Sequence, residues 1–398
     1  MKVVVTGIGC VSAIGLNIQE TVSSLAHEKS GLQPLFLFES KYKDKLPVGE
    51  VKAGNSDLIG RLQLNPAKTY SRTALLGMLA AREAFEDAGL NERQTKCLRI
   101  GFISGTSVGG MDCSEVFYYD YQHSASKGKL RNIISHDCGD STEKIASYLK
   151  INDYISTVST ACSSAANAII VGARLIKHDF LDCVIVGGTD ALCRFTLNGF
   201  VSLKILDENP CRPFDASRQG LNLGEGAGYV VLEKDTNHYF KNYGYLAGYA
   251  NVNEAFHQTA SSTEGTGALL SMQKALQTAN LAPGQIDYIN LHGTGTQNND
   301  WAEGNAVRIL FADSLPYFSS TKSFTGHTLG ACGGIEAVFS ILAIKYGATF
   351  PNLNYETPMP EHGLVPEIRY TGNRNIQKVL SNSFGFGGNM SSLIFSGI

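Results

Sequence analysis

The stretch VSTACSSAANAIIVGARLIK, residues 158–177, decides the fold prediction for this chain. It starts as a β-like run, which we expect to be a strand over 155–160, and then passes through a turn of small residues. From residue 163 onward it has the pattern of a helix that is apolar nearly all round, predicted over 163–177. Because a helix without a polar face is buried, this segment predicts a strand followed by a central helix.

The same arrangement returns 170 residues later. The tetrapeptide ACGG at 331–334 opens a second apolar helix, predicted over 335–346, just as ACSS at 161–164 opens the first. Each tetrapeptide follows a turn rich in Thr, Ser and Gly. Two glycine-rich helix starts can look alike by chance, or the chain can consist of two related halves packed about a shared centre. The pattern by itself leaves both interpretations open.

Valine- and isoleucine-rich runs alternate with longer helical patterns along the rest of the chain, which indicates an α/β architecture with buried strands. Strands are predicted over residues 2–8, 99–104, 155–160, 182–188, 227–233, 286–292, 378–384 and 391–396. Helices are predicted over residues 69–88, 163–177, 266–279, 301–311 and 335–346.

The composition is that of an ordinary globular chain. Its 398 residues, 43% hydrophobic and 17% charged, suffice for two or three domains or for one large duplicated unit. A formal net charge of −3 argues against nucleic-acid binding as the main function. We expect no membrane insertion, because no uninterrupted apolar run is long enough to span a bilayer. Nine cysteines without CxxC or zinc-ligand spacing suit a reduced cytosolic protein and predict no metal site.

Cys162 is the first candidate for chemistry. It stands at the start of a predicted helix, where the helix dipole and free backbone N–H groups lower the pKa of a thiol. The alternative is a buried structural cysteine, and position alone does not separate the two. Cys332 has the same placement but is followed by two glycines, and we interpret it as a packing residue.

Two histidines lie on loops of small residues at the ends of predicted elements. His292 follows a strand in LHGTGT, and His327 lies in TKSFTGHTLGACGG, five positions after Lys322. Ligands collect at strand ends in α/β sheets. Each histidine taken singly also suits a core or capping role, but such roles are a weaker explanation for two histidines and Cys162 that all share this context.

Two glycine-rich segments remain. The loop SFGFGG at 383–388 could turn backbone N–H groups inward as oxyanion-hole donors, or it could be a simple tight turn. Gly7-x-Gly9 follows the first strand as in a dinucleotide fingerprint, but Ser12 stands at the third glycine position. We therefore expect no nucleotide cofactor, and no other cofactor is indicated.

Four motifs, in this order, resemble those of the β-ketoacyl-acyl-carrier-protein synthases, in the synthase I/II branch of the thiolase-fold condensing enzymes. They are VSTACSSAANAI (158–169), LHGTGTQNND (291–300), STKSFTGHTLGACGGIEA (320–337) and SNSFGFGG (381–388). RPFDASRQGLNLGEGAG (212–228) and SGTSVGGM (104–111) also fit, so the resemblance covers the whole chain.

The resemblance implies a thiolase-like fold, in which two duplicated α/β halves stack as a five-layer α-β-α-β-α sandwich. Residues 1–240 would form the N-terminal half with the nucleophilic cysteine, and 241–398 the C-terminal half with both histidines and a gating loop. Members are usually dimers that join along the strand before the nucleophile, here 155–160. The partner would be a second copy or a related subunit.

The resemblance also implies roles for individual residues. Cys162 matches the nucleophile, and His292 and His327 match the paired active-site histidines. Lys322 and Glu336 match a supporting charged pair. Phe384 and Phe386 match gating residues, with the Phe386 N–H in the oxyanion hole. Thr294 and Thr296 match contacts of the phosphopantetheine arm, and Val108 matches a residue that sets tunnel width.

The implied reaction is a decarboxylative Claisen condensation between a Cys-bound acyl group and malonyl-acyl-carrier protein. It would serve fatty-acid or polyketide and polyene elongation in the cytoplasm. An acidic carrier protein would dock on basic residues around the tunnel mouth, although each of these also suits an ordinary solvated surface. The candidates are Arg61, Lys68, Lys127, Lys129, Arg131 and Lys204.

Two other functional interpretations are consistent with the same fold. One is a non-catalytic partner subunit that sets chain length, against which Cys162 speaks because such partners typically lack the nucleophile. The other is a thiolase, which uses a second cysteine as base where this chain has His327. The chain also departs from the usual pattern at Asn389-Met390, where Thr-Asn is common, which puts the support of the gating loop in doubt.

Overall fold

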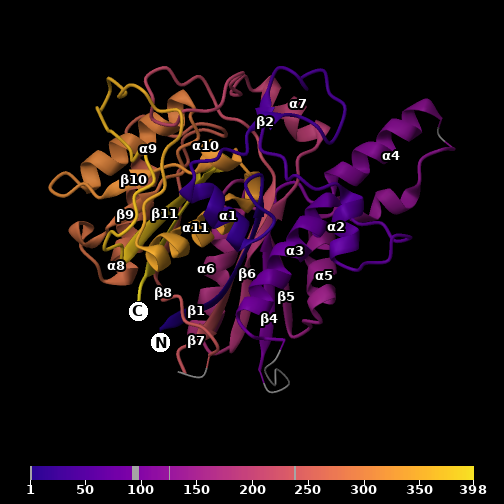
Figure 1. Cartoon of the computed structure of the whole chain (residues 1–398), viewed down its shortest axis with the longest axis horizontal. Coiled ribbons are helices and arrows are strands. Elements are labelled where there is room, and N and C mark those ends of the chain that lie inside the picture. The colour runs from indigo at the N-terminus through magenta and orange to yellow at the C-terminus, as the bar shows by residue number, and fades with distance from the viewer. Residues whose placement is uncertain (1, 92–97, 125, 237–238) are drawn as a thin grey trace.

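The computed structural model describes residues 2–91, 98–124, 126–236 and 239–398 (Figure 1). Within these residues, ten strands form one sheet in the order β10-β9-β11-β12-β8-β1-β7-β6-β4-β5. Their bounds are β1 Val3–Ser12, β4 Ile100–Gly105, β5 Tyr154–Val158, β6 Cys183–Asp190, β7 Gly226–Lys234, β8 Tyr245–Asn253, β9 Tyr288–Asn290, β10 Tyr317–Ser319, β11 Lys378–Gly385 and β12 Asn389–Ser396. A separate short pair joins β2 (Gln33–Pro34) to β3 (Pro47–Val48).

The sheet consists of two five-stranded halves with the same topology. The ladder pairing between β8 and β1 is limited to the pair Val4–Tyr245, and this is where the two halves of the sheet meet. Numbered within its half, each set of strands has the order third, second, fourth, fifth, first. The first three strands of that order run parallel and the last two pairings are antiparallel in both halves. The duplication suggested by the two helix starts is therefore present in the fold.

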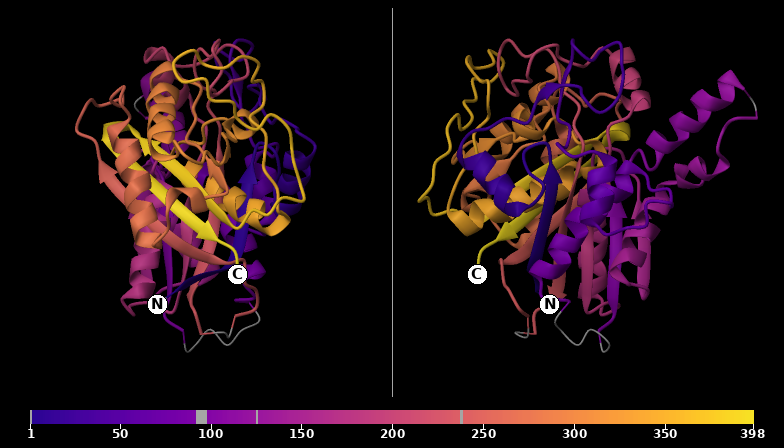
Figure 2. Two further views of the ribbon diagram at one scale, coloured as in Figure 1. Left: turned by 90° about the vertical axis from the view of Figure 1, so that its left-hand side faces the viewer. Right: turned by 45° about the vertical axis from the view of Figure 1, so that its right-hand side comes forward.

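Helices cover both faces of the two halves and give five layers. The helices are α1 Ile18–Ala26, α2 Asn55–Arg61, α3 Arg72–Asp87, α4 Met111–His123, α5 Cys138–Leu149, α6 Ser164–Lys177, α7 Arg194–Ser202, α8 Thr266–Ala279, α9 Gln297–Leu310, α10 Lys322–Thr325 and α11 Cys332–Tyr346. α3 packs on β1 and β7, and α8 packs on β8 and β12, as the outer layers. α6 and α11 contact each other and strands of both halves, so they form the central layer (Figures 1 and 2).

The central layer is close-packed at glycines. A Cβ atom on Gly334 of α11 would lie 2.3 Å from the carbonyl oxygen of Gly228 in β7, so these two positions need glycine for helix and strand to approach. The largest apolar core cluster includes Ile169 and Ala173 of α6 and Val338 and Phe339 of α11. Burial of both helices confirms what their apolar patterns predicted.

Among the described residues, the helical stretch Leu329–Tyr346 is long and apolar enough to cross a membrane by length and composition, although Glu336 and Lys345 interrupt its apolar run. In the fold, 83% of this stretch is buried. Its apolar surface is therefore covered by the two sheet halves, as expected of a core helix.

All eight predicted strands and all five predicted helices are present, with ends displaced by a few residues. The elements that the sequence patterns missed among the described residues are α1, α2, α4, α5, α7, α10, β2, β3, β8 and β10. α4 buries none of its residues and projects from the body (Figure 2), so its apolar side chains do not form a stripe that faces the core. β8 alternates between buried and partly exposed positions, but its Ala, Gly and Asn residues have low strand propensity.

Candidate active site

The candidate site is a cavity of about 270 Å³ beside the turn before α6 and the loops that follow β9 and α10. Cys162, His292 and His327 all line it, although they lie far apart along the chain. Phe384, Phe386, Thr294 and Thr296 line it as well, and so does Lys204. The fold therefore brings the cysteine, both histidines, the two phenylalanines and the two threonines of the prediction to one cavity.

Cys162 lies in the turn between β5 and α6 and is 5% exposed. Ala161 has a φ of 52°, in the left-handed region, which turns the chain sharply just before the cysteine. The backbone N–H groups of Phe386 and of Cys162 itself both interact with the thiol. Two N–H groups directed at one point form a site where a negatively charged oxygen can be held.

The thiol of Cys162 is less acidic than the helix-start position predicted. Burial raises its pKa to about 11, because removing the charged thiolate from water costs more than the opposing effects return. The Lys322 ammonium and the Phe386 N–H lower the pKa, but they do not offset the burial. The expectation of a lowered thiol pKa is therefore wrong.

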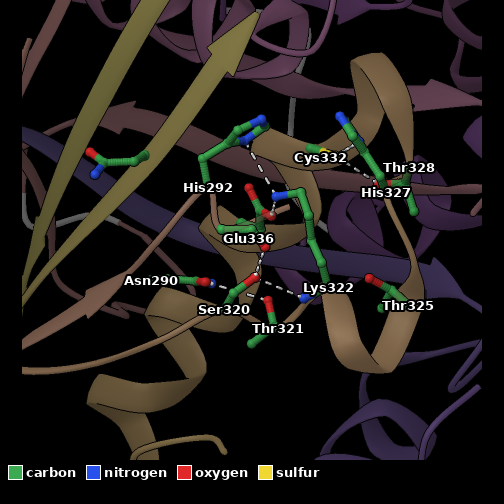
Figure 3. Close-up of polar contacts among 12 residues, drawn as sticks. Asn290, His292, Ser320, Thr321, Lys322, Thr325, His327, Thr328, Cys332 and Glu336 are labelled. Atoms are coloured by element: carbon green, nitrogen blue, oxygen red, sulfur yellow. Dashed lines mark hydrogen bonds and ion pairs between the residues drawn. The ribbon is translucent and has the colours of Figure 1, made fainter. Parts of the chain in front are cut away.

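His292 follows β9 and is fixed by a carboxylate of α9. Its backbone N–H donates to Oε1 of Glu303 at 2.9 Å, and the N–H of Gly293 donates to Oε2 at 2.8 Å. The Nζ of Lys322 lies 3.4 Å from Nδ1 of the His292 ring (Figure 3). A lysine ammonium only donates, so Nδ1 is the acceptor and the ring hydrogen of a neutral His292 is on Nε2.

His327 has its hydrogen on the corresponding atom. The backbone N–H of Leu329 donates to its Nδ1 at 3.2 Å, which again leaves the ring hydrogen of the neutral form on Nε2. The two rings are nearly perpendicular, at 87°, with their centroids 5.4 Å apart. Two N–H donors thus belong to rings that face one cavity.

Both imidazoles are held neutral. Burial lowers the pKa of His292 well below its usual value, and the positive charge of Lys322 and the neighbouring His327 add to this. Burial and the charge of Lys322 do the same to the pKa of His327. The site therefore presents hydrogen-bond donors rather than imidazolium ions at neutral pH.

Lys322 and Glu336 form a buried ion pair beneath the histidines, with Nζ 2.5 Å from Oε1 (Figure 3). Burial alone would lower the pKa of Lys322, but the Glu336 carboxylate reverses this and the pKa ends above its usual value. Burial raises the pKa of Glu336 against the opposing charge of Lys322. Lys322 thus remains a fixed cation that opposes protonation of His292.

The loop 385–388 lies over the cavity and is held by hydrogen bonds on both sides. Phe384 is buried with its ring 5.8 Å from that of His292, and the ring of Phe386 stacks on Phe200 at 6.0 Å. Gly387 and Gly388 have φ values of 80° and 79°, which side chains rarely allow. The loop backbone bonds to Gln258 and Glu254 of a second loop.

Asn389, where the family pattern more often has Thr, supports the end of this loop. Its Oδ1 accepts from Ser163 Oγ at 2.7 Å, Asn167 Nδ2 at 2.8 Å and Asn251 Nδ2 at 2.7 Å. These donors come from both halves of the chain. The departure at this position therefore leaves the loop firmly anchored beside Cys162.

Some predicted residues lie away from the cavity. Val108 does not line it; its N–H donates to Asp190 at 3.1 Å and its side chain packs on an apolar cluster that includes the cavity residue Leu221. All six basic candidates are exposed, but of these only Lys204 lines the cavity. The other five carry no sign of a docking role beyond their charge.

Sequence reasoning missed Asp190, Glu303 and Cys332. Asp190 ends β6 and accepts hydrogen bonds from the backbone N–H groups of Ser107, Val108 and Gly330, which links the two halves next to His327. An acidic residue at the end of a buried strand was the available signal. Glu303 gave none, because it lies inside an ordinary helical pattern.

Cys332, interpreted from the sequence as a packing residue, touches the site chemically. Its Sγ lies 3.0 Å from Nδ1 of His327. It is buried and does not line the cavity.

Among the residues that the structure describes, no three or more His, Cys, Asp or Glu side chains are grouped so as to hold a metal ion.

Comparisons with known proteins agree on the type of chain. The family model described as "Beta-ketoacyl synthase, N-terminal domain" matches residues 1–238, and the corresponding C-terminal domain model matches 243–356. The chain is 31% identical to 3-oxoacyl-[acyl-carrier-protein] synthase 2 of Staphylococcus aureus over 407 residues, covering 99% of this chain and 98% of the relative. It is 33% identical to the Coxiella burnetii protein of the same name over 413 residues, with the same coverage.

Solved structures give the same result for the fold. The ishigamide ketosynthase/chain length factor superposes with a TM-score of 0.92 at 28% identity, covering 100% of this chain and 99% of that one. The ketosynthase ApeO in complex with its chain length factor ApeC, from Xenorhabdus doucetiae, gives 0.86 at 30% identity, covering 100% and 98%. A complex of AntDE with the acyl-carrier protein AntF gives 0.87 at 26%, covering 100% and 99%.

Proposed function

The chain belongs to the β-ketoacyl synthase family, and we propose that Cys162 is its acyl-carrying nucleophile and that His292 and His327 promote decarboxylation of its malonyl substrate. The chain is a condensing acyltransferase of fatty-acid or polyketide elongation. The observation that carries the assignment of residues is that the cysteine and the two neutral, Nε2-protonated histidines line one cavity.

The first step loads the acyl group. The sulfur of Cys162 attacks the thioester carbonyl of an acyl carrier, and the carbonyl oxygen becomes an anion held by the N–H groups of Cys162 and Phe386. The carrier thiol then leaves as its C–S bond breaks and takes up a proton, so that one thioester replaces another. Since the thiol pKa is about 11, its proton must pass to a base as the attack proceeds. Because the cavity-facing Nε2 of both histidines already carries a hydrogen, the departing carrier sulfur is the group that takes up this proton.

The second step generates the carbon nucleophile without a strong base. A malonyl thioester loses CO₂ when its C–C bond electrons move to the thioester carbonyl, which becomes an enolate. The Nε2–H groups of His292 and His327 donate to that developing oxygen anion. Each preorganised donor of this kind contributes on the order of 3 kcal/mol. Lys322 keeps His292 neutral and in the tautomer that can donate.

The third step joins the two units. The enolate carbon attacks the acyl carbonyl on Cys162, whose oxygen again takes the charge between the two backbone N–H groups. Collapse of this intermediate breaks the bond to sulfur and releases β-ketoacyl product on its carrier. The sulfur of Cys162 leaves as a thiolate and takes up a proton from solvent.

We propose that the phosphopantetheine arm of an acyl-carrier protein enters past Thr294 and Thr296. Both threonines line the cavity, and their hydroxyl oxygens lie 2.9 Å apart, so one of them can turn a donor toward an amide of the arm. Lys204 lies exposed at the cavity and is the docking residue that we favour for the acidic carrier. Val108 would influence the acyl chain only through the apolar cluster behind Leu221.

The second partner is a chain of the same fold, either another copy or a related subunit. β5 is an edge strand of the sheet, with Tyr154 36% and Ile155 39% exposed. The projecting helix α4 also exposes Val116, Tyr118 and Tyr121. An exposed strand edge flanked by apolar side chains favours pairing with another chain. Chromatography with light scattering on the pure protein will show a dimer if the partner is another copy and a monomer if it is a related subunit.

We also propose a division of the chain into 1–240 and 241–398, and a cytoplasmic location. The repeated strand order and the two matched family models support the division. Among the described residues, Cys10, Cys162 and Cys332 are free thiols, which suits a reducing compartment.

The two alternative functions, a non-catalytic partner subunit and a thiolase, are less well supported. A non-catalytic subunit would not need a cysteine in the oxyanion-hole turn. A thiolase would need a second cysteine facing the substrate, whereas Cys332 does not line the cavity.

Mass spectrometry of the protein after incubation with a panel of acyl-carrier thioesters tests the proposal. We expect one acyl group on the peptide that contains Cys162. An unmodified Cys162 with every acyl group would overturn the proposal, and an acyl group on another cysteine would reassign the nucleophile.

A further inference from the structure

Cys332 begins α11 and contacts His327, one of the two histidines that donate to the enolate oxygen in the proposed mechanism. Its sulfur lies 3.0 Å from Nδ1 of His327, and the Thr328 hydroxyl donates to the sulfur at 3.4 Å (Figure 3). The three side chains come from one turn between His327 and the start of α11. The thiol thus makes two polar contacts in addition to its packing.

The hydrogen atoms of this cluster have one consistent arrangement. The Thr328 hydroxyl donates to the sulfur, so the thiol hydrogen is free to point at Nδ1 of His327. Nδ1 carries one lone pair, which the Leu329 N–H also approaches at 3.2 Å. Burial raises the pKa of Cys332 above its usual value, so the sulfur keeps its hydrogen at neutral pH.

We propose that Cys332 is a positioning residue for His327. Its S–H group, oriented by Thr328, donates to Nδ1 and holds the ring in the tautomer and orientation in which Nε2–H faces the cavity. The result is a chain of donors from Thr328 through Cys332 and the imidazole to the enolate oxygen, in which each hydrogen bond polarises the next. This inference rests on the proposed role of His327 in decarboxylation.

The charged and titratable groups around His327 determine its pKa, which the test of this proposal measures. The titratable groups that face its ring are His292 from the β9 loop, Lys322 of α10, Cys162 before α6 and Cys332 itself. Glu336 acts through Lys322, and Asp190 reaches the same turn through the Gly330 N–H. A donor to Nδ1 favours the neutral ring, so its removal will raise the pKa of His327.

The test measures CO₂ release from malonyl-carrier thioester in a Cys162→Gln background, which separates decarboxylation from condensation. Cys332→Ala removes the thiol donor, and Cys332→Ser replaces it with a hydroxyl donor. Cys193→Ala is the matched control, because that buried cysteine also contacts a threonine, at 3.5 Å, but no histidine. Thermal melting of each variant checks that it is folded.

We expect Cys332→Ala to lower kcat by about fivefold while KM stays within about twofold, the size expected for loss of one weak donor. The acid limb of its pH profile will move to higher pH. Cys332→Ser will restore most of kcat and the position of the limb, and Cys193→Ala will leave both unchanged.

Two outcomes would overturn the positioning role. One is a Cys332→Ala variant with an unchanged kcat and acid limb, and the other is a folded Cys332→Ser variant as impaired as Cys332→Ala. Failure of the proposed function is distinguishable, because then the Cys162→Gln parent itself would release no CO₂.

Discussion

The ammonium of Lys322 lies 3.4 Å from Nδ1 of His292 and thereby determines which nitrogen of that ring carries its hydrogen. The same ammonium is paired with Glu336 at 2.5 Å, so it cannot turn away from the histidine without leaving a buried carboxylate unpaired. One fixed cation therefore sets both the tautomer and the charge of His292. Several measurable consequences follow from this arrangement.

Replacing Lys322 by methionine will weaken decarboxylation more than acyl loading. The substitution keeps the side-chain volume but removes the donor to His292 and the charge that opposes its protonation. We expect the rate of CO₂ release to fall about a hundredfold, as for loss of one preorganised group in an active site. Stopped assays of CO₂ release and of acyl transfer on the same preparation measure both steps. An equal loss in the two steps would contradict a role that acts mainly through His292.

The pH dependence of stability will carry a signature of His327. Its pKa is below the ordinary 6.5 in the folded state, so below about pH 6.5 the unfolded state binds more protons and stability falls as pH decreases. The contribution is up to about 1.4 kcal/mol per pH unit. His327→Asn keeps an acceptor for the Leu329 N–H but does not titrate. Urea unfolding across this range should therefore show a smaller acid loss in the variant, and identical slopes would mean that the histidine titrates normally.

The thiol of Cys162 will react slowly with alkylating agents in the unliganded protein. With a pKa of about 11, the thiolate fraction rises about tenfold for each pH unit below that value. The rate of carbamidomethylation of Cys162, followed by mass spectrometry, should show this rise without a plateau near neutrality. Lys322→Met should slow the reaction further, because the ammonium lowers this pKa. A plateau near neutral pH would show that the free thiol is already activated.

Asn389 will prove important for the loop over the cavity. Asn389→Ala leaves donors of Ser163, Asn167 and Asn251 without their shared acceptor, at a cost of about 1–3 kcal/mol in unfolding free energy. Asn389→Asp keeps the acceptor oxygen and serves as the matched control. Chemical denaturation measures the stability, and the loading rate of Cys162 measures the effect on the site next to Ser163. Equal stability of the alanine variant and the wild type would contradict this account.

Much of the fold was predictable from the sequence because its central elements are fully buried. The apolar runs that became β1, β6 and β7 and the helices α6 and α11 have no exposed face to disguise their pattern. The residues of the site were found because they share a context of small residues at element ends. That they meet in one cavity came from the family resemblance, since no local pattern encodes a contact between positions 162 and 327.

The remaining features depend on tertiary surroundings that a sequence does not display. The helix start at Cys162 argued for an acidic thiol, but burial dominates and raises the pKa. Cys332 was taken as packing because its neighbours are glycines, whereas its contact with His327 depends on the geometry of one turn. α4 was missed because it packs on little of its own chain and exposes apolar side chains that suit a partner.

The central claim is that the uncharged imidazoles of His292 and His327 promote decarboxylation of the malonyl thioester independently of Cys162, which carries the acyl chain. Release of CO₂ from malonyl-carrier thioester by Cys162→Gln, in which the amide imitates an acylated cysteine, measures this most directly. The account predicts steady CO₂ release without condensation product, and its loss on adding His327→Ala. A folded Cys162→Gln protein that releases no CO₂, or one whose release is unaffected by His327→Ala, would contradict it.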